Sequence, residues 1–164
     1  VPFCLQGGTV FCRGIGEELT VLADLASIPL LLVKPEAGLS TALVYREMRS
    51  AEISVRPDTP QVIAAITSHD LERLAACTAN VLEMAAQRLH PDIAAIKREV
   101  QATGAVLAMM SGSGPAVFGL YNDAEARDEA LNSLAARLPG TRIIPASTIS
   151  HGPETVNDKN MDQW

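Results

Sequence analysis

The sequence is poor in aromatic residues and in basic charge. Aromatic residues make up 4% of its 164 residues, so an apolar core has to be built from Ala, Leu, Ile and Val. Lysine and arginine number 13 against 19 aspartate and glutamate, which gives a net charge of −6. Nucleic acids and anionic membranes are bound by basic patches, and none is visible here. The sequence therefore argues against both kinds of partner.

Cysteines and long apolar runs are also few. The three cysteines, Cys4, Cys12 and Cys77, are odd in number and form no C-x-x-C pair. A disulfide scaffold or a zinc site is therefore not expected. We expect a cytoplasmic location instead. No apolar run approaches a membrane span, and no signal peptide is visible. The hydrophobic content of 48% is nevertheless sufficient for a sizeable core.

Strand and helix signals together predict an α+β fold, with a mostly antiparallel sheet and helices packed on one face. A hairpin is expected from strands 9–13 and 17–22, followed by a buried strand over 29–34. Later strands are expected at 105–110, 116–121 and 142–149. The predicted helices cover 40–48, a segment opened by Thr59-Pro60, a long helical segment from 71 to 89, 91–103 and 123–138.

The stretch MMSGSGPAVFGLY, residues 109–121, holds a glycine turn between two apolar runs. Gly112 and Gly114 free the backbone on both sides of Ser113. One interpretation is a tight connection between two buried strands; the other is a concave row of backbone N–H groups that faces an anion such as a phosphate. A P-loop is excluded because no Lys-Ser/Thr follows, and the G-x-G-x-x-G spacing is absent.

Other candidate residues are sparse. Ser40 is a good N-cap, and in the helix that it starts Thr41 and Tyr45 are four residues apart, so they share one face. Spacing alone favours an ordinary packing role for Tyr45. The three histidines, His69, His90 and His151, are expected to be surface or capping residues rather than ligands. The residues alone thus show no catalytic set and no metal site.

Four blocks of the sequence recur, in this order, in one enzyme family. They read VPFCLQGGTVFCRGIGEEL, LLLVKPEAGLSTALVYREM, NVLE and HPDIAAIKREVQATGAVLAMMSGSGPAVFGLY. Through them the chain resembles the C-terminal part of the 4-diphosphocytidyl-2-C-methyl-D-erythritol kinases. These belong to the superfamily of galactokinase, homoserine kinase, mevalonate kinase and phosphomevalonate kinase. The resemblance covers nearly all of residues 1–150.

The resemblance implies a cytoplasmic, ATP-dependent kinase of non-mevalonate isoprenoid biosynthesis that uses Mg²⁺. Such an enzyme phosphorylates the 2-hydroxyl of a methylerythritol linked to cytidine diphosphate. The implied fold is the ferredoxin-like C-terminal domain of the superfamily. In this interpretation residues 1–27 end the N-terminal lobe, 28–150 form the C-terminal kinase domain, and 151–164 are a disordered polar tail.

The resemblance also implies site residues. Gly112, Ser113 and Gly114 match the family motif close to the nucleotide phosphates. Thr41 and Tyr45 match the hydroxyl and the aromatic ring that contact the cytidine moiety, and a ring that stacks on a base suits that role.

Other parts of the family pattern are not in this chain. The family's catalytic aspartate directly precedes the Val-Pro that is Val1-Pro2 here, and its catalytic lysine and main glycine-rich ATP loop lie further upstream. We therefore expect no catalytic residue in this chain, no kinase activity from it alone, and self-association through the surface that the N-terminal lobe would cover. Residues 80–83 read Asn-Val-Leu-Glu where the family has Asn-Asp-Leu-Glu, which leaves the implied roles intact.

Two alternatives stay open at this point. One is another kinase of the same superfamily, of the homoserine or mevalonate type. The other is a non-catalytic α+β module that binds a small ligand or a partner chain.

Overall fold

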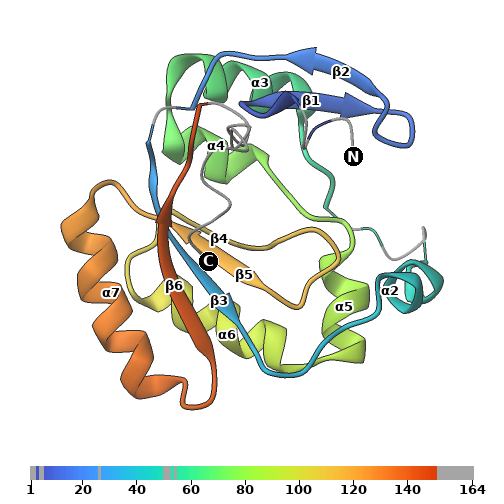
Figure 1. Ribbon diagram of the computed structural model, residues 1–164. Coiled ribbons are helices and arrows are strands. Elements are labelled where there is room, and N and C mark those ends of the chain that lie inside the picture. The colour runs from blue at the N-terminus through green and yellow to red at the C-terminus, as the bar shows by residue number, and fades with distance from the viewer. Residues whose placement is uncertain (1–2, 4–5, 26, 50–52, 54, 151–164) are drawn as a thin grey trace, which may run out of the picture.

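The computed structural model describes residues 3, 6–25, 27–49, 53 and 55–150 (Figure 1). The tail predicted for 151–164 lies outside the described residues, as do Val1, Pro2, Cys4 and His151.

The chain is built around a four-stranded antiparallel sheet. Its strands are β3 (Pro29–Lys34), β4 (Leu107–Met110), β5 (Val117–Leu120) and β6 (Arg142–Ser147), in the order β4-β5-β3-β6. All three neighbouring pairs are antiparallel. The α+β class is confirmed.

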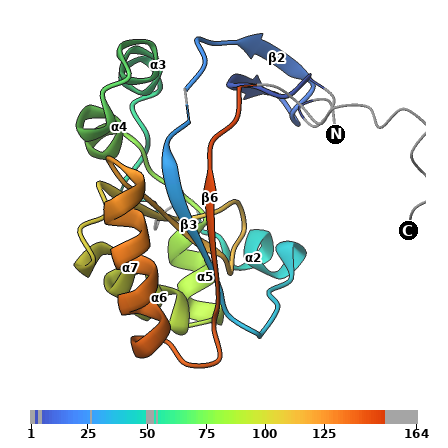
Figure 2. The ribbon, with the colours of Figure 1, turned by 60° about the vertical axis from the view of Figure 1, so that its left-hand side comes forward.

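Helices cover one face of this sheet. They are α5 (Glu83–Leu89), α6 (Asp92–Ala102) and α7 (Ala124–Arg137). Figure 2 shows α6 and α7 together on one side of β3 and β6. On α6, the spacing of Ile93, Ile96 and Val100 puts all three on one face, and all three are buried. They share the main core with residues of the sheet and of α7: Leu31, Val33, Met110, Val117, Ala130 and Leu134.

A second, smaller core lies against the opposite face of the sheet, since its strand residues Leu30 and Phe118 alternate with Leu31 and Val117 of the main core. It is formed by α3 (Thr59–Ser68) and α4 (Leu71–Cys77), which lie at the top of Figure 1. Buried Ile66 and Leu74 belong to the same cluster as Leu120 of β5. The hairpin of β1 (Val10–Arg13) and β2 (Glu18–Val21) forms a separate two-stranded sheet, also at the top of Figure 1.

Three predicted helix starts are confirmed by side-chain caps. Ser40 accepts a hydrogen bond from the Leu43 amide at the start of α2 (Thr41–Glu47), with a distance of 3.5 Å. Asp58 accepts from the Gln61 amide at 3.2 Å, and Asp123 from the Ala126 amide at 2.8 Å. Each cap satisfies one N–H group that lacks a partner within its helix.

The prediction of one long helical segment over residues 71–89 is wrong. It is divided into α4 and α5, and residues 78–82 connect the two. The side chain of Asn80 explains the break, because its Oδ1 accepts from the Leu82 amide at 3.0 Å. Such local bonds compete with the bonds of a helix. The break brings Asn80 to the glycine turn.

Within the described residues, none of the helices is both long and apolar enough to cross a membrane.

Candidate functional site: the glycine turn and its cleft

The glycine turn joins β4 to β5, and two backbone hydrogen bonds close it. The Ser111 amide donates to the Ala116 carbonyl at 2.8 Å, and the Gly114 amide donates to the Ser111 carbonyl at 2.9 Å. Gly112 has a φ of 55°, whereas Ser113 has a negative φ. This is the pattern of a type II′ turn, which favours glycine at its second residue.

The turn is only partly exposed. Gly112 is exposed, but Ser113 and Gly114 are half-buried. Gly114 also has a positive φ, of 81°, and a Cβ there would lie 2.6 Å from Sδ of Met110. The turn therefore sits against the core, since Met110 is buried on the helix-covered face of the sheet.

Two N–H groups of the turn are available to a ligand. Among the described residues, neither the Gly112 amide nor the Ser113 amide has a hydrogen-bond acceptor. They belong to successive residues, one of which has a positive φ. Backbone N–H groups in such an arrangement bind anions. Of the two interpretations of the turn, the geometry therefore allows the anion site as well as the tight connection.

Thr41 and Ser113 are brought together although 72 positions separate them in the sequence. Their hydroxyl oxygens are 2.8 Å apart, which is a hydrogen bond. The first residue of α2 therefore touches the middle of the glycine turn. The residues that the resemblance assigned to two different ligands adjoin each other.

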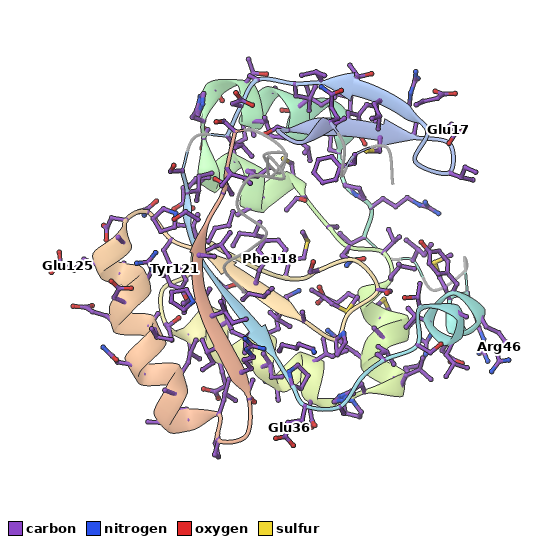
Figure 3. The ribbon with its side chains drawn as sticks, viewed as in Figure 1. Glu17, Glu36, Arg46, Phe118, Tyr121 and Glu125 are labelled. Carbon is purple, nitrogen blue, oxygen red and sulfur yellow. The ribbon has the colours of Figure 1, made fainter. Side chains whose placement is uncertain are left out.

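Tyr45 lies one helical turn further along α2 and is 57% exposed. Its ring lines an open cleft of about 450 Å³. Phe118 of β5, which lies in the middle of the sheet, also lines this cleft (Figure 3). The side chain of Arg46, the next residue of α2, points away from the sheet. The other residues lining the cleft come from the end of α2, the α4–α5 connection, β4 and the turn: Met48, Pro57, Ala79, Asn80, Val81, Leu82, Met109, Met110, Ser111 and Gly112.

Contacts with α5 hold α2 beside the turn. Arg88 donates from Nε to a carboxylate oxygen of Glu47 at 3.1 Å and from Nη2 to the Glu47 carbonyl at 3.3 Å. Val44, on the inner side of α2, is fully buried in the main core. Because α2 is anchored in this way, Thr41 and Tyr45 have a fixed position relative to the turn.

Sequence reasoning gave no role to two residues that contact this site. Asn80 donates from Nδ2 to the carbonyls of Met110 and Gly112, at 2.9 and 2.7 Å. The Glu83 carboxylate is buried and accepts from the Met110 amide at 3.3 Å. Glu83 precedes buried Ala86 by three residues, so the helical period placed this carboxylate on the buried face. A carboxylate on the buried face of a helix was therefore the sequence signal that could have identified Glu83.

Comparison with known proteins agrees with this architecture. Residues 62–140 match the family described as GHMP kinases C terminal. The matched segment runs from α3 to the end of α7 and includes the glycine turn. The chain contains a GHMP kinase C-terminal domain.

Curated relatives carry one enzyme name. A 4-diphosphocytidyl-2-C-methyl-D-erythritol kinase of Alkaliphilus metalliredigens is 41% identical over 144 residues, which cover 88% of this chain and 50% of the relative. A kinase with the same name from Acetivibrio thermocellus is 45% identical over 123 residues, covering 75% of this chain and 44% of the relative. The chain thus spans about half the length of the curated relatives that it matches.

Solved structures share the fold of this GHMP kinase domain. A crystal structure of 4-(cytidine 5′-diphospho)-2C-methyl-D-erythritol kinase superposes with a TM-score of 0.70 at 28% identity, over 88% of this chain and 50% of that one. Homoserine kinase from Cytophaga hutchinsonii has a TM-score of 0.76 at 20% identity, over 94% and 53%. The second likeness shows the fold alone.

Proposed function

We propose that the chain is the C-terminal part of an ATP-dependent kinase that phosphorylates the 2-hydroxyl of 4-diphosphocytidyl-2-C-methyl-D-erythritol. One observation carries the proposal. The glycine turn, with two N–H groups that lack acceptors among the described residues, is hydrogen-bonded through Ser113 to Thr41, on the helix that presents Tyr45. The proposal therefore places a phosphate site next to an aromatic platform for a base.

In this proposal the turn binds the phosphates of ATP. The amides of Gly112 and Ser113 donate to phosphate oxygens, and the positive φ of Gly112 and Gly114 gives the backbone the shape to do so. The turn offers N–H donors, and no group of three metal-binding side chains is found among the described residues. In this proposal Mg²⁺ is held mainly by the phosphates of ATP, its usual arrangement in kinases.

The substrate's cytidine binds next to α2. The exposed ring of Tyr45 stacks on the cytosine, and Thr41 places its hydroxyl between the cytidine site and the phosphate site. In this proposal the chain supplies binding and orientation. Phosphoryl transfer depends on such positioning together with electrostatic stabilisation of the transferred group. The shared name and 41–45% identity of the relatives favour this substrate over homoserine or mevalonate.

Substitution of Tyr45 tests the proposal in the chain itself. Cytidine diphosphate and MgATP are titrated separately by calorimetry against the wild type, Tyr45→Ala and Tyr45→Phe. Base stacking is worth about 1–3 kcal/mol, so Tyr45→Ala should weaken cytidine diphosphate binding by roughly 5- to 150-fold. Tyr45→Phe should bind like the wild type, because stacking needs the ring and not the hydroxyl. MgATP binding should change little in either variant.

Leu43 provides the matched control, since it is exposed on the same helix and is 40% accessible. Leu43→Ala should leave both affinities unchanged. Equal affinity of Tyr45→Ala and the wild type for cytidine diphosphate would remove Tyr45 from the site and return it to the role of a surface residue.

A further inference from the structure

Asn80 is hydrogen-bonded to two alternate carbonyls at the start of the glycine turn, those of Met110 and Gly112. Its Nδ2 atom donates one hydrogen to Met110 O and the other to Gly112 O, and its Oδ1 accepts from the Leu82 amide. Both donor positions and one acceptor position of the carboxamide are therefore used. An aspartate has the same shape but has no hydrogen to give to the two carbonyls.

These bonds fix the direction of two N–H groups. In a trans peptide the C=O and the following N–H point in opposite directions. Because Asn80 holds the Met110 carbonyl, the Ser111 amide points the other way, and there it closes the turn on Ala116. Because Asn80 also holds the Gly112 carbonyl, the Ser113 amide points away from Asn80, where no described residue accepts it.

The neighbouring amide is set by the turn itself. The Ser111 carbonyl accepts from the Gly114 amide, so the Gly112 amide, on the same peptide as that carbonyl, points out of the turn. The peptide between Gly112 and Ser113 is the central peptide of the type II′ turn. Rotation of this one peptide would turn the Ser113 amide toward Asn80 and remove it from the anion side.

Glu83 holds the strand end from the same direction as Asn80. Its Oε2 accepts from the Met110 amide at 3.3 Å. Its Oε1 accepts from Gln87 at 3.0 Å and from Lys97 on α6 at 2.5 Å. The side chain of Glu83 is only 12% exposed, so the partial loss of hydration is offset by these three bonds. Asn80 and Glu83 thus bind the carbonyl and the amide of the same residue, Met110.

We propose that Asn80 and Glu83 are positioning residues of the phosphate site. Asn80 selects the orientation of the Gly112–Ser113 peptide in which the Ser113 amide faces the ligand, and Glu83 fixes the strand end from which the turn starts. The nature of the ligand, a polyphosphate, rests on the proposed function. The orientation of the peptide does not, and it can be tested without any ligand.

The test compares Asn80→Asp and Asn80→Ala with Asn132→Asp in the 164-residue chain. Asn132 is exposed on α7, so Asn132→Asp adds the same negative charge away from the turn. The first measurement is the amide spectrum of ¹⁵N-labelled protein. Both Asn80 variants should move the Gly112 and Ser113 signals and leave those of α7 in place, whereas Asn132→Asp should do the reverse.

The second measurement is the affinity for inorganic tripolyphosphate. Loss of a hydrogen bond to a charged group costs about tenfold or more in affinity, and both Asn80 variants should show such a loss. Asn132→Asp should stay within about twofold of the wild type, since surface charges far from a site are screened. Thermal unfolding of each variant reports any general loss of structure, which would not by itself change the affinity of the folded fraction.

Glu83→Gln is the conservative variant of the second residue. It retains an oxygen for the Met110 amide, so it should bind tripolyphosphate within a few-fold of the wild type. Glu83→Leu removes that acceptor, so it should speed hydrogen exchange of the Met110 amide and weaken binding as Asn80→Ala does.

The two proposals fail in different ways. If the wild type binds no tripolyphosphate, the assignment of phosphate to the turn is wrong, and the amide spectra still decide the role of Asn80. If the wild type binds but both Asn80 variants keep its affinity and its Gly112 and Ser113 signals, the positioning role is overturned.

Discussion

Gly119→Ala tests the packing that places α6 under the sheet. A Cβ at Gly119 would lie 2.6 Å from Cγ1 of Val100 and 3.3 Å from Cβ of Ala105. Carbon atoms prefer about 3.5–4.0 Å, so the new methyl group is about 1 Å too close. Val100 is fully buried, and a valine in a helix has essentially one rotamer, so it has no alternative position to adopt.

The expected magnitude follows from two opposing terms. Overpacking of a core costs about 1–3 kcal/mol. Replacing glycine within a strand recovers about 0.5–1 kcal/mol of backbone entropy. With the middle of each range, the free energy of unfolding should fall by about 1 kcal/mol, measured by urea unfolding followed by circular dichroism.

Val100→Ala provides the internal control, since it removes the atom that the methyl group strikes. The double variant should lose less stability than the sum of the single variants, by about 0.5–3 kcal/mol, as contacting residues do. Strict additivity, or a Gly119→Ala protein as stable as the wild type, would show that α6 does not approach β5 as closely as described.

Further predictions concern the ends of α7 and β5. Asp123→Ala removes the side-chain cap of α7 and should lower the free energy of unfolding by about 0.5–2 kcal/mol, whereas Asp123→Asn, which can still cap, should lose much less. Tyr121 follows β5 (Figure 3) and is fully buried; this burial raises its pKa above 10.0, which the hydrogen bond to Thr103 partly counteracts. Because the pKa is higher in the folded state, the stability linked to Tyr121 is fully present below pH 10.0 and is lost as pH rises through the folded pKa. Urea titrations at increasing alkaline pH should therefore show a fall in stability that Tyr121→Phe reduces.

Local signals in the sequence were enough for most elements. The run Pro29–Lys34 is apolar and too short for a helix, and it is strand β3 with those same ends. The caps Ser40 and Asp123 are side chains that act on amides three residues away, so their effect is visible in the sequence. The family resemblance identified the domain, which the match of residues 62–140 confirms.

The arrangement of the site depends on contacts between residues that are far apart in the sequence, and these could not be predicted from it. The apolar period continues from Leu74 to Leu82, which hides the break at Asn80. The bonds that join Asn80 to the glycine turn reach residues 30 and 32 positions away. The hydrogen bond between Thr41 and Ser113 spans 72 positions and depends on the docking of α2 on α5. Local spacing holds no information on either contact.

The most direct test of the proposed function maps both ligands on one protein. The ¹⁵N-labelled chain is titrated with MgADP and, separately, with cytidine diphosphate in the absence of Mg²⁺. The account predicts that MgADP shifts the amide signals of Gly112 and Ser113 most strongly, and that cytidine diphosphate shifts those of Thr41 and Tyr45. MgADP shifts that leave the glycine turn unaffected, together with cytidine diphosphate shifts away from α2, would contradict it.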